Sequence, residues 1–203
     1  NMKLNYIDVL TELSNDKQYN GNISAMQWHS AADTTNFWNA YGFKYDALNR
    51  LTEAGYGAYN IASTTTFLSY YKDNYNEKVQ GYDKNGNITK LNRRGIDTVT
   101  LGVPHYATID SLTYNYSLGI YYSNKLQKVS DATTSNVTGR GDFYDVNNAI
   151  DYTYDGNGNL TSDLNKGITS IEYNVLNLPQ KVIFVAGQKF IDYIYTAAGA
   201  LVQ

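Results

Sequence analysis

Apolar and polar residues alternate along much of this chain. In one stretch Ile150, Tyr152 and Tyr154 occupy every second position, and the same alternation runs through residues 41–45 and 191–195. A period of two is typical of a β-strand that buries one of its faces. The pattern therefore predicts half-buried antiparallel strands, with most of the tyrosines on the buried face.

Three further stretches complete the expected elements. Alternation continues from residue 112 to residue 122, which predicts one long strand. The segment KVIFVAG, residues 181–187, is apolar on both faces and predicts a covered strand. Alternation is weak over residues 60–76, where we expect a loop or a short helix.

A short phrase recurs between the alternating stretches. YDGNGNLT at 154–161 has a near copy in YDKNGNIT at 82–89 and a looser one in YDALNRLT at 45–52. Asn and Gly tolerate positive φ, so each phrase can close a hairpin that places its tyrosine opposite the aliphatic residue that follows. The pairs with this spacing are Tyr45 and Leu51, Tyr82 and Ile88, Tyr154 and Leu160, Tyr173 and Pro179, and Tyr195 and Leu201.

Two shorter versions of the phrase have a spacing of four, Tyr19 with Ile23 and Tyr122 with Leu126. Removing one residue from each arm of a hairpin keeps the paired side chains on one face, whereas removing a single residue would not. We therefore expect one repeat region over residues 1–203, with turns near 19–23, 45–51, 82–88, 122–126, 154–160, 173–179 and 195–201.

Composition excludes several classes of function. The chain has 21 tyrosines, 6 phenylalanines, 16 glycines and 2 prolines, which favours strands and turns. A net charge of −3 and a pI near 5.3 argue against a nucleic-acid partner. Cysteine is absent, which excludes disulfides and thiolate chemistry. No apolar run approaches the roughly 20 residues of a membrane span, so we expect no membrane insertion.

Candidate chemical groups favour turns over a metal site. His29 and His105 have no second ligand near them in the sequence, and a metal site needs three or four. Asp83 and Asp155 begin calcium-like D-x-N-G segments, but an EF-hand needs a glutamate at its twelfth position. Arg94 and Lys166 occupy those positions, so we expect no metal and no cofactor.

The repeat aspartates and tyrosines raise two further hypotheses. Asp46, Asp83 and Asp155 are possible paired carboxylates of a glycosidase. An aspartate at the start of a turn more commonly accepts a hydrogen bond from the backbone two residues on, so we expect no enzyme activity. Exposed rows of tyrosine could stack on sugar rings. A surface carbohydrate- or protein-binding module is therefore the alternative function.

The repeated phrases resemble the YD repeats of the RHS family. The resemblance is carried by FKYDALNRLTEA, GYDKNGNITKLNRRG, YTYDGNGNLTSDLNKG and YNVLNLPQKV, and it extends from about Leu13 to Gln203. The family includes bacterial polymorphic toxins, shell subunits of toxin complexes and animal teneurins. The resemblance implies an all-β fold in which antiparallel hairpins form a curved or spiralling sheet, as part of a shell around an effector domain.

The resemblance also implies a context for the chain. We expect a bacterial protein that is secreted or displayed at the cell surface. Its partners would be the rest of a longer parent chain and its effector domain, because residues 1–14 lack the features of a signal peptide and look like a start within a chain. Cut repeats would leave unpaired strand edges, so edge-strand self-association is also expected.

One departure limits what the resemblance transfers. Toxin shells often end in Asp-Pro steps and an aspartate-dependent self-cleavage. Here Pro104 and Pro179 are preceded by Val103 and Leu178. No self-cleavage residues are carried over, and no toxin domain is recognised. The expected function is a structural repeat scaffold that encapsulates or presents an effector.

Overall fold

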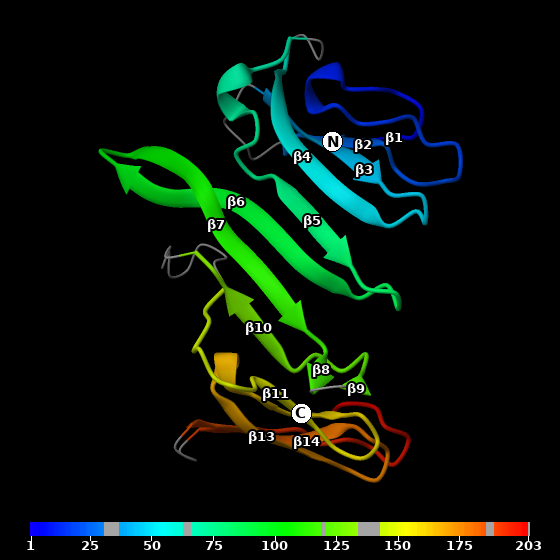
Figure 1. Ribbon diagram of the computed structural model, residues 1–203, viewed down its shortest axis with the longest axis vertical. Helices are drawn as coiled ribbons and strands as arrows, with labels where there is room; N and C mark the ends of the chain where they lie inside the picture. Colours follow the sequence, from blue (N-terminus) through cyan, green and yellow to red (C-terminus); the bar gives the residue numbers. More distant parts are fainter. Residues whose placement is uncertain (31–36, 63–65, 119–120, 134–142, 186–188, 203) are drawn as a thin grey trace. The chain divides into compact units, whose positions relative to one another are not determined.

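The computed structural model describes residues 1–30, 37–62, 66–118, 121–133, 143–185 and 189–202 (Figure 1). The chain divides into two compact units, Asn1–Leu112 with Ala132–Phe143, and Thr113–Asp131 with Tyr144–Gln203. The sequence predicts one repeat region over 1–203, and repeat turns occur in both units.

Antiparallel strands in a mostly sequential order make up the fold. The larger sheet has the order β1 (Met2–Asn5), β2 (Ala25–Trp28), β3 (Phe37–Tyr45), β4 (Leu51–Asn60), β5 (Glu77–Tyr82), β6 (Ile88–Thr100), β7 (Val103–Asn115) and β10 (Lys128–Asp131). The smaller sheet has the order β11 (Tyr152–Tyr154), β12 (Leu160–Asp163), β13 (Ile168–Tyr173), β14 (Pro179–Phe184) and β15 (Phe190–Asp192). The all-β antiparallel prediction is confirmed.

Short elements connect these strands. They are the 3-10 turns η1 (Thr11–Leu13), η2 (Ser69–Tyr71) and η3 (Leu164–Lys166), and the two-stranded pair β8 (Ser117–Leu118) and β9 (Tyr121–Tyr122). Across the described ranges, no helix is long and apolar enough to span a bilayer.

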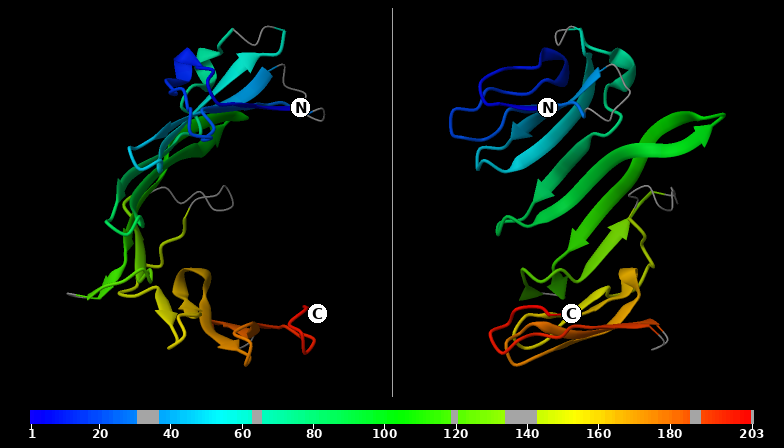
Figure 2. Two further views of the ribbon diagram at one scale, coloured as in Figure 1. Left: turned by 90° about the vertical axis from the view of Figure 1, so that its right-hand side faces the viewer. Right: turned by 180° about the vertical axis from the view of Figure 1, so that it is seen from behind.

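Small residues form the buried face of β3 and β4. The segment that carries η1 packs against this face, visible beside the strands in Figure 2. A Cβ on Gly42 would lie 2.8 Å from the Cβ of Leu13, and a Cβ on Gly57 would lie 2.6 Å from the ring of Phe67. Ala40 is fully buried between them. The close approach of backbone and side chains explains why these positions are Gly and Ala.

The tyrosines of β3 lie on the opposite face, whereas Tyr59 of β4 is buried together with Leu13 and Ala40. Alternation puts Tyr41 and Phe43 on the face away from Ala40 and Gly42, and both rings are only half-buried. The prediction that most tyrosines occupy the buried face is therefore wrong for β3. Period two identified the two faces correctly, but the glycines and alanines, which contribute little to an apolar pattern, mark the buried one.

The second unit shows a similar reversal. Asp151 is fully buried, whereas Ile150 is 40% exposed. The Asp151 carboxylate accepts a hydrogen bond from the backbone N–H of Val129 at 2.9 Å, and its own N–H donates to the Gln127 carbonyl at 2.9 Å. These bonds join β10 to the segment that enters β11. A buried polar group needs such partners, and alternation of polarity cannot reveal them.

Two other strand predictions also need correction. The alternating run 112–122 is not one strand, because β7 ends at Asn115 and β8 pairs with β9; residues 119–120 lie outside the described part. In the run 181–187 the strand β14 ends at Phe184; Val182 is buried on one face, but its neighbour Ile183 on the other face is only half-buried, and residues 186–187 are not described. The loop expected over 60–76 contains η2, with residues 63–65 outside the described part.

Candidate functional site

The five turns with six-residue spacing share one geometry. In every one the tyrosine pairs with the aliphatic residue or proline that follows the turn, which we call the closing residue. The pairs are Tyr45 with Leu51, Tyr82 with Ile88, Tyr154 with Leu160, Tyr173 with Pro179, and Tyr195 with Leu201. The pairing predicted from the spacing is confirmed for these turns.

Each of these turns has a three-residue loop. In the turn after Tyr82, the Asp83 N–H donates to the Asn87 carbonyl at 2.9 Å, and the Gly86 N–H donates to the Asp83 carbonyl at 3.2 Å. Gly86 has φ of +89°. This is a type I turn followed by a left-handed residue. The left-handed residues of the five turns are Asn49, Gly86, Gly158, Asn177 and Gly199.

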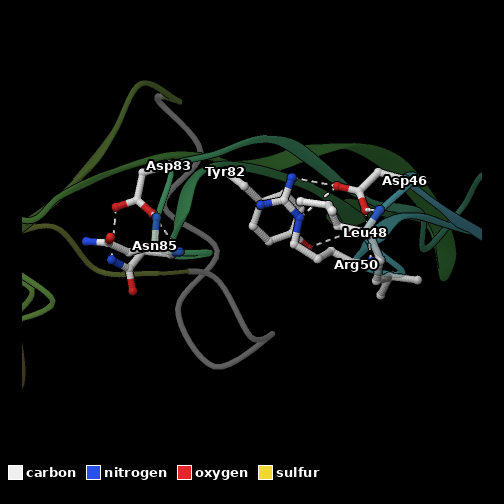
Figure 3. Close-up of polar contacts among 8 residues, drawn as sticks. Asp46, Leu48, Arg50, Tyr82, Asp83 and Asn85 are labelled. Atoms are coloured by element: carbon white, nitrogen blue, oxygen red, sulfur yellow. Dashed lines mark hydrogen bonds and ion pairs between the residues drawn. The ribbon is translucent and has the colours of Figure 1, made fainter.

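The first turn residue holds the loop with its side chain. One carboxylate oxygen of Asp83 accepts from the backbone N–H groups of Asn85 and Asn87 at 2.8 and 2.9 Å. The other oxygen accepts from the Asn87 amide at 2.9 Å. Figure 3 shows the Asp83 carboxylate beside Asn85. Asp155 repeats all three bonds with Asn157 and Asn159. The expected hydrogen bond to the second residue on is confirmed, and the bond to the fourth is an addition.

In the turn after Tyr45, an arginine, Arg50, occupies the position that Asn87 has in the turn after Tyr82. Asp46 accepts from the backbone N–H groups of Leu48 and Arg50, and the Arg50 guanidinium pairs with its second oxygen at 2.6 Å (Figure 3). Hydrogen bonds from Arg50 hold the pKa of Asp46 below 3.8. Hydrogen bonds led by the Asn87 and Asn159 side chains do the same for Asp83 and Asp155. Each carboxylate is thus occupied within its own turn.

A one-residue β-bulge follows every closing residue for which the register extends past the turn. Lys44 pairs with Glu53 while Tyr45 pairs with Leu51, which leaves Thr52 unpaired. The equivalent bulged residues in the other hairpins are Thr89, Thr161 and Gln180. The threonine that ends each of the three phrases is therefore the bulged residue. Sequence reasoning missed the bulges, although the recurrent threonine was their signal.

The repeat tyrosines join successive hairpins. The hydroxyl of Tyr173 donates to the carbonyl of Leu160, the closing residue of the preceding turn, at 2.8 Å. The same bond runs from Tyr195 to Pro179 at 2.9 Å, from Tyr154 to Leu126 at 2.9 Å, from Tyr45 to Ile23 at 2.8 Å, and from Tyr82 to Leu51. We call these bonds the tyrosine ties. Burial is the main factor raising the pKa of four of the donors, Tyr45, Tyr82, Tyr154 and Tyr173.

The two four-residue pairings predicted from the sequence are wrong. Tyr19, Ile23 and Leu126 belong to no strand or bridge, and Tyr122 pairs with Ser117. The closing residues Ile23 and Leu126 nevertheless accept tyrosine ties. These two copies therefore keep the carbonyl that accepts the tyrosine tie. They do not keep the pairing between the closing residue and the tyrosine that precedes it.

Register identifies Tyr6 as the repeat tyrosine of the first hairpin. In the regular hairpins the residue before the tyrosine pairs with the second residue after the closing residue, as in Lys44 with Glu53. In the first hairpin Asn5 pairs with Ala25, two residues after Ile23. Tyr6 therefore has the equivalent position, and the hairpin contains a long insertion that carries η1. Because of this insertion, Tyr6 and Ile23 do not have the short spacing of the other turns.

Neighbouring turns also contact one another. The Asn20 amide donates to the Asn49 side chain at 2.6 Å, and the Arg50 guanidinium lies 4.3 Å above the centre of the Tyr82 ring. In the second unit the side-chain amides of Asn157 and Asn159 both donate to Asn177. The turns of each unit thus form a row of bonded neighbours, which we call the turn row.

The buried aspartate of β7 and the two histidines do not form a metal or catalytic cluster among the described residues. Asp110 is fully buried and pairs with Arg93 at 2.5 Å. His29 lies 6.0 Å from Trp38, ring centre to ring centre, and His105 is exposed on β7. Among the described residues no three His, Cys, Asp or Glu side chains gather as metal ligands.

Comparison with known proteins leaves the family open. A scan against protein-family models finds no match, and a search of curated proteins finds no similar sequence. The function must therefore be inferred from the repeat geometry.

Proposed function

We propose that this chain is a structural repeat scaffold of the RHS/YD type, a shell segment that encloses or presents an effector domain. The observation that carries the proposal is the tyrosine tie, which joins consecutive hairpins in both units with the same donor and the same acceptor position. Each hairpin is therefore bonded to the preceding one in the same way, as expected of a protein in which each repeat contacts its neighbours.

The polar chemistry of the turns supports the same proposal. The carboxylates of Asp46, Asp83 and Asp155 are engaged by their own turns, and they hold the backbone in shape. Groups used in this way stabilise a fold without acting on a substrate. The proposal places the protein outside the cell or at the bacterial surface, with the rest of a parent chain and its effector domain as partners.

The test begins with the complete reading frame that encodes this chain. We expect further YD hairpins beside it and an effector domain in the same polypeptide. In the purified full-length protein the effector should resist proteolysis, and Tyr154→Phe combined with Tyr173→Phe should increase its cleavage. A frame without further hairpins, or an effector cleaved equally fast in both proteins, would contradict the proposal.

A further inference from the structure

The half-exposed aromatic face of the first unit contains a hollow that the scaffold proposal does not use. Its volume is about 370 Å³, within the range of small-ligand sites of about 300–1,000 Å³. The residues that line it and matter here are Tyr41, Tyr75, Glu77, Arg93, Arg94 and Ile109.

Aromatic contacts hold the wall of the hollow in place. Tyr41 stacks on Trp28 with ring centres 5.7 Å apart, and Tyr75 meets Tyr56 and Tyr106 edge-on at 5.0 and 5.2 Å. The Tyr41 hydroxyl donates to the Tyr75 carbonyl at 3.0 Å. The wall is therefore formed before any ligand arrives, which lowers the entropic cost of binding.

The two arginines of the hollow are also oriented by the protein. Arg93 pairs with the buried carboxylate of Asp110 at 2.5 Å. Arg94 donates from Nε to the Asp73 carbonyl at 2.9 Å and from Nη2 to the Tyr106 carbonyl at 3.2 Å. A guanidinium has five N–H donors, so Arg94 keeps donors beyond these two bonds.

Glu77 supplies the opposite chemistry. It lies across from Arg93 in the β5–β6 pairing and is exposed. Within the described ranges its carboxylate accepts no hydrogen bond and belongs to no ion pair, so it can accept a hydrogen bond from a ligand. Burial, and then the Glu77 carboxylate, raise the pKa of Tyr41 to about 12, so the adjacent hydroxyl is neutral.

The charges select the class of ligand. Two guanidinium groups are balanced by Glu77 and by Asp110 beneath Arg93, so the hollow favours neither an anion nor a cation. An aromatic wall with fixed donors and an exposed acceptor suits a ring that has apolar C–H faces and hydroxyl edges. We propose that this hollow binds a neutral saccharide of one or two sugar units, with Glu77 accepting from a sugar hydroxyl.

The saccharide site does not depend on the shell proposal, so each can be tested without the other. A glycan array tests the saccharide site directly. The 203-residue chain should be applied to an array of neutral and acidic oligosaccharides. We expect neutral glycans to be retained. The strongest of them should then be titrated calorimetrically against the wild type, Glu77→Gln and Tyr41→Leu, and each substitution should weaken binding by about tenfold or more.

Glu172→Gln is the matched control, because Glu172 is an exposed strand glutamate of β13 in the other unit. It should leave the affinity unchanged. Tyr41→Leu could lower the melting temperature, which would make its weaker binding ambiguous. In that case two other measurements test the site: the affinity of Glu77→Gln, and the change in chemical shift of the Arg94 Nε–H and the Ile109 methyl groups when the glycan is added. Retention of acidic glycans only, no retention, unaltered affinity of Glu77→Gln, or unchanged shifts at saturation would each overturn the proposal.

Discussion

The tyrosine hydroxyl explains why this chain uses tyrosine at its repeat positions where phenylalanine would fill the same space. The ring covers the neighbouring hairpin, and the hydroxyl satisfies a carbonyl beside a turn and a bulge. Tyr45, Tyr154 and Tyr173 each donate such a bond at 2.8–2.9 Å. A buried or half-buried carbonyl without a partner would be costly, so the hydroxyl stabilises the junction between hairpins.

Removing one tyrosine tie should therefore lower stability. Tyr173→Phe deletes the hydroxyl that donates to Leu160 and keeps the ring, so we expect a loss of about 1 kcal/mol in the free energy of unfolding. Urea denaturation would measure it. Tyr193→Phe is the control, because Tyr193 stacks on Tyr195 and its hydroxyl makes no hydrogen bond within the described residues. Equal effects of the two substitutions would refute a role for the tie.

The turn aspartates predict how stability depends on pH. Hydrogen bonds within the turns hold the pKa values of Asp83 and Asp155 below 3.8 in the folded chain. A depressed folded pKa contributes stability that is present above the unfolded value and lost as the pH falls through the folded value. The urea midpoint should therefore decrease as the pH falls below about 4.

Asp83→Asn combined with Asp155→Asn should make that decrease shallower, because neither side chain can then lose a charge. Asn174 already occupies the equivalent position of another turn and accepts both backbone bonds, so the variant should fold. Asp16→Asn, at an exposed position outside the turns, is the control. A slope unchanged by the double substitution would contradict the assignment.

At the scale of the element, the turn distinguishes between glycines that look equivalent in the sequence. Gly156 and Gly158 both belong to the phrase YDGNGNLT. Gly158 has φ of +91°, whereas Gly156 does not have positive φ and has open space around its Cα. Only one of them therefore requires glycine.

Gly158→Ala should destabilise the chain by about 1 kcal/mol, because an L side chain is strained in the left-handed conformation. Gly156→Ala should be neutral or slightly stabilising, since alanine has fewer unfolded conformations. Thermal unfolding of the two variants compares them directly. A larger loss for Gly156→Ala would mean that the turn has another geometry.

The sequence predicted the strands and turns more reliably than it predicted which face of a strand is buried or which hairpins are bonded to each other. The hairpins and the pairing of Tyr45 with Leu51 followed from alternation and turn chemistry, because both are local. The buried face of β3 did not, because Ala40 and Gly42 are chosen for close packing against Leu13, which is distant in the sequence. The tyrosine ties and the position of Tyr6 depend on register between hairpins, which no local pattern specifies.

At the scale of the whole molecule, each sheet ends in a strand that pairs on one side only among the described strands. β1 is the first strand of the larger sheet and β15 the last strand of the smaller one. Met2 and Leu4 are exposed on β1, and Phe190 and Ile191 on β15. Exposed apolar edges recruit other strands.

We therefore expect self-association that increases with concentration, measurable by light scattering. Leu4→Lys combined with Ile191→Lys should reduce it, because charged side chains protect an edge. Val175→Lys is the control, since Val175 is 99% exposed within a turn. A monomer at all concentrations would show that the edges are protected in another way.

The most direct test of the hairpin junctions is the exchange of the tyrosine hydroxyl protons. In mixed H₂O and D₂O, a slowly exchanging hydroxyl splits the ¹³Cζ signal of its ring into two lines. The tyrosine ties predict split signals for Tyr45, Tyr82, Tyr154, Tyr173 and Tyr195, and we expect single averaged signals for Tyr19 and Tyr193. Averaged signals for the five repeat tyrosines would contradict the tyrosine ties and, with them, the proposed scaffold function.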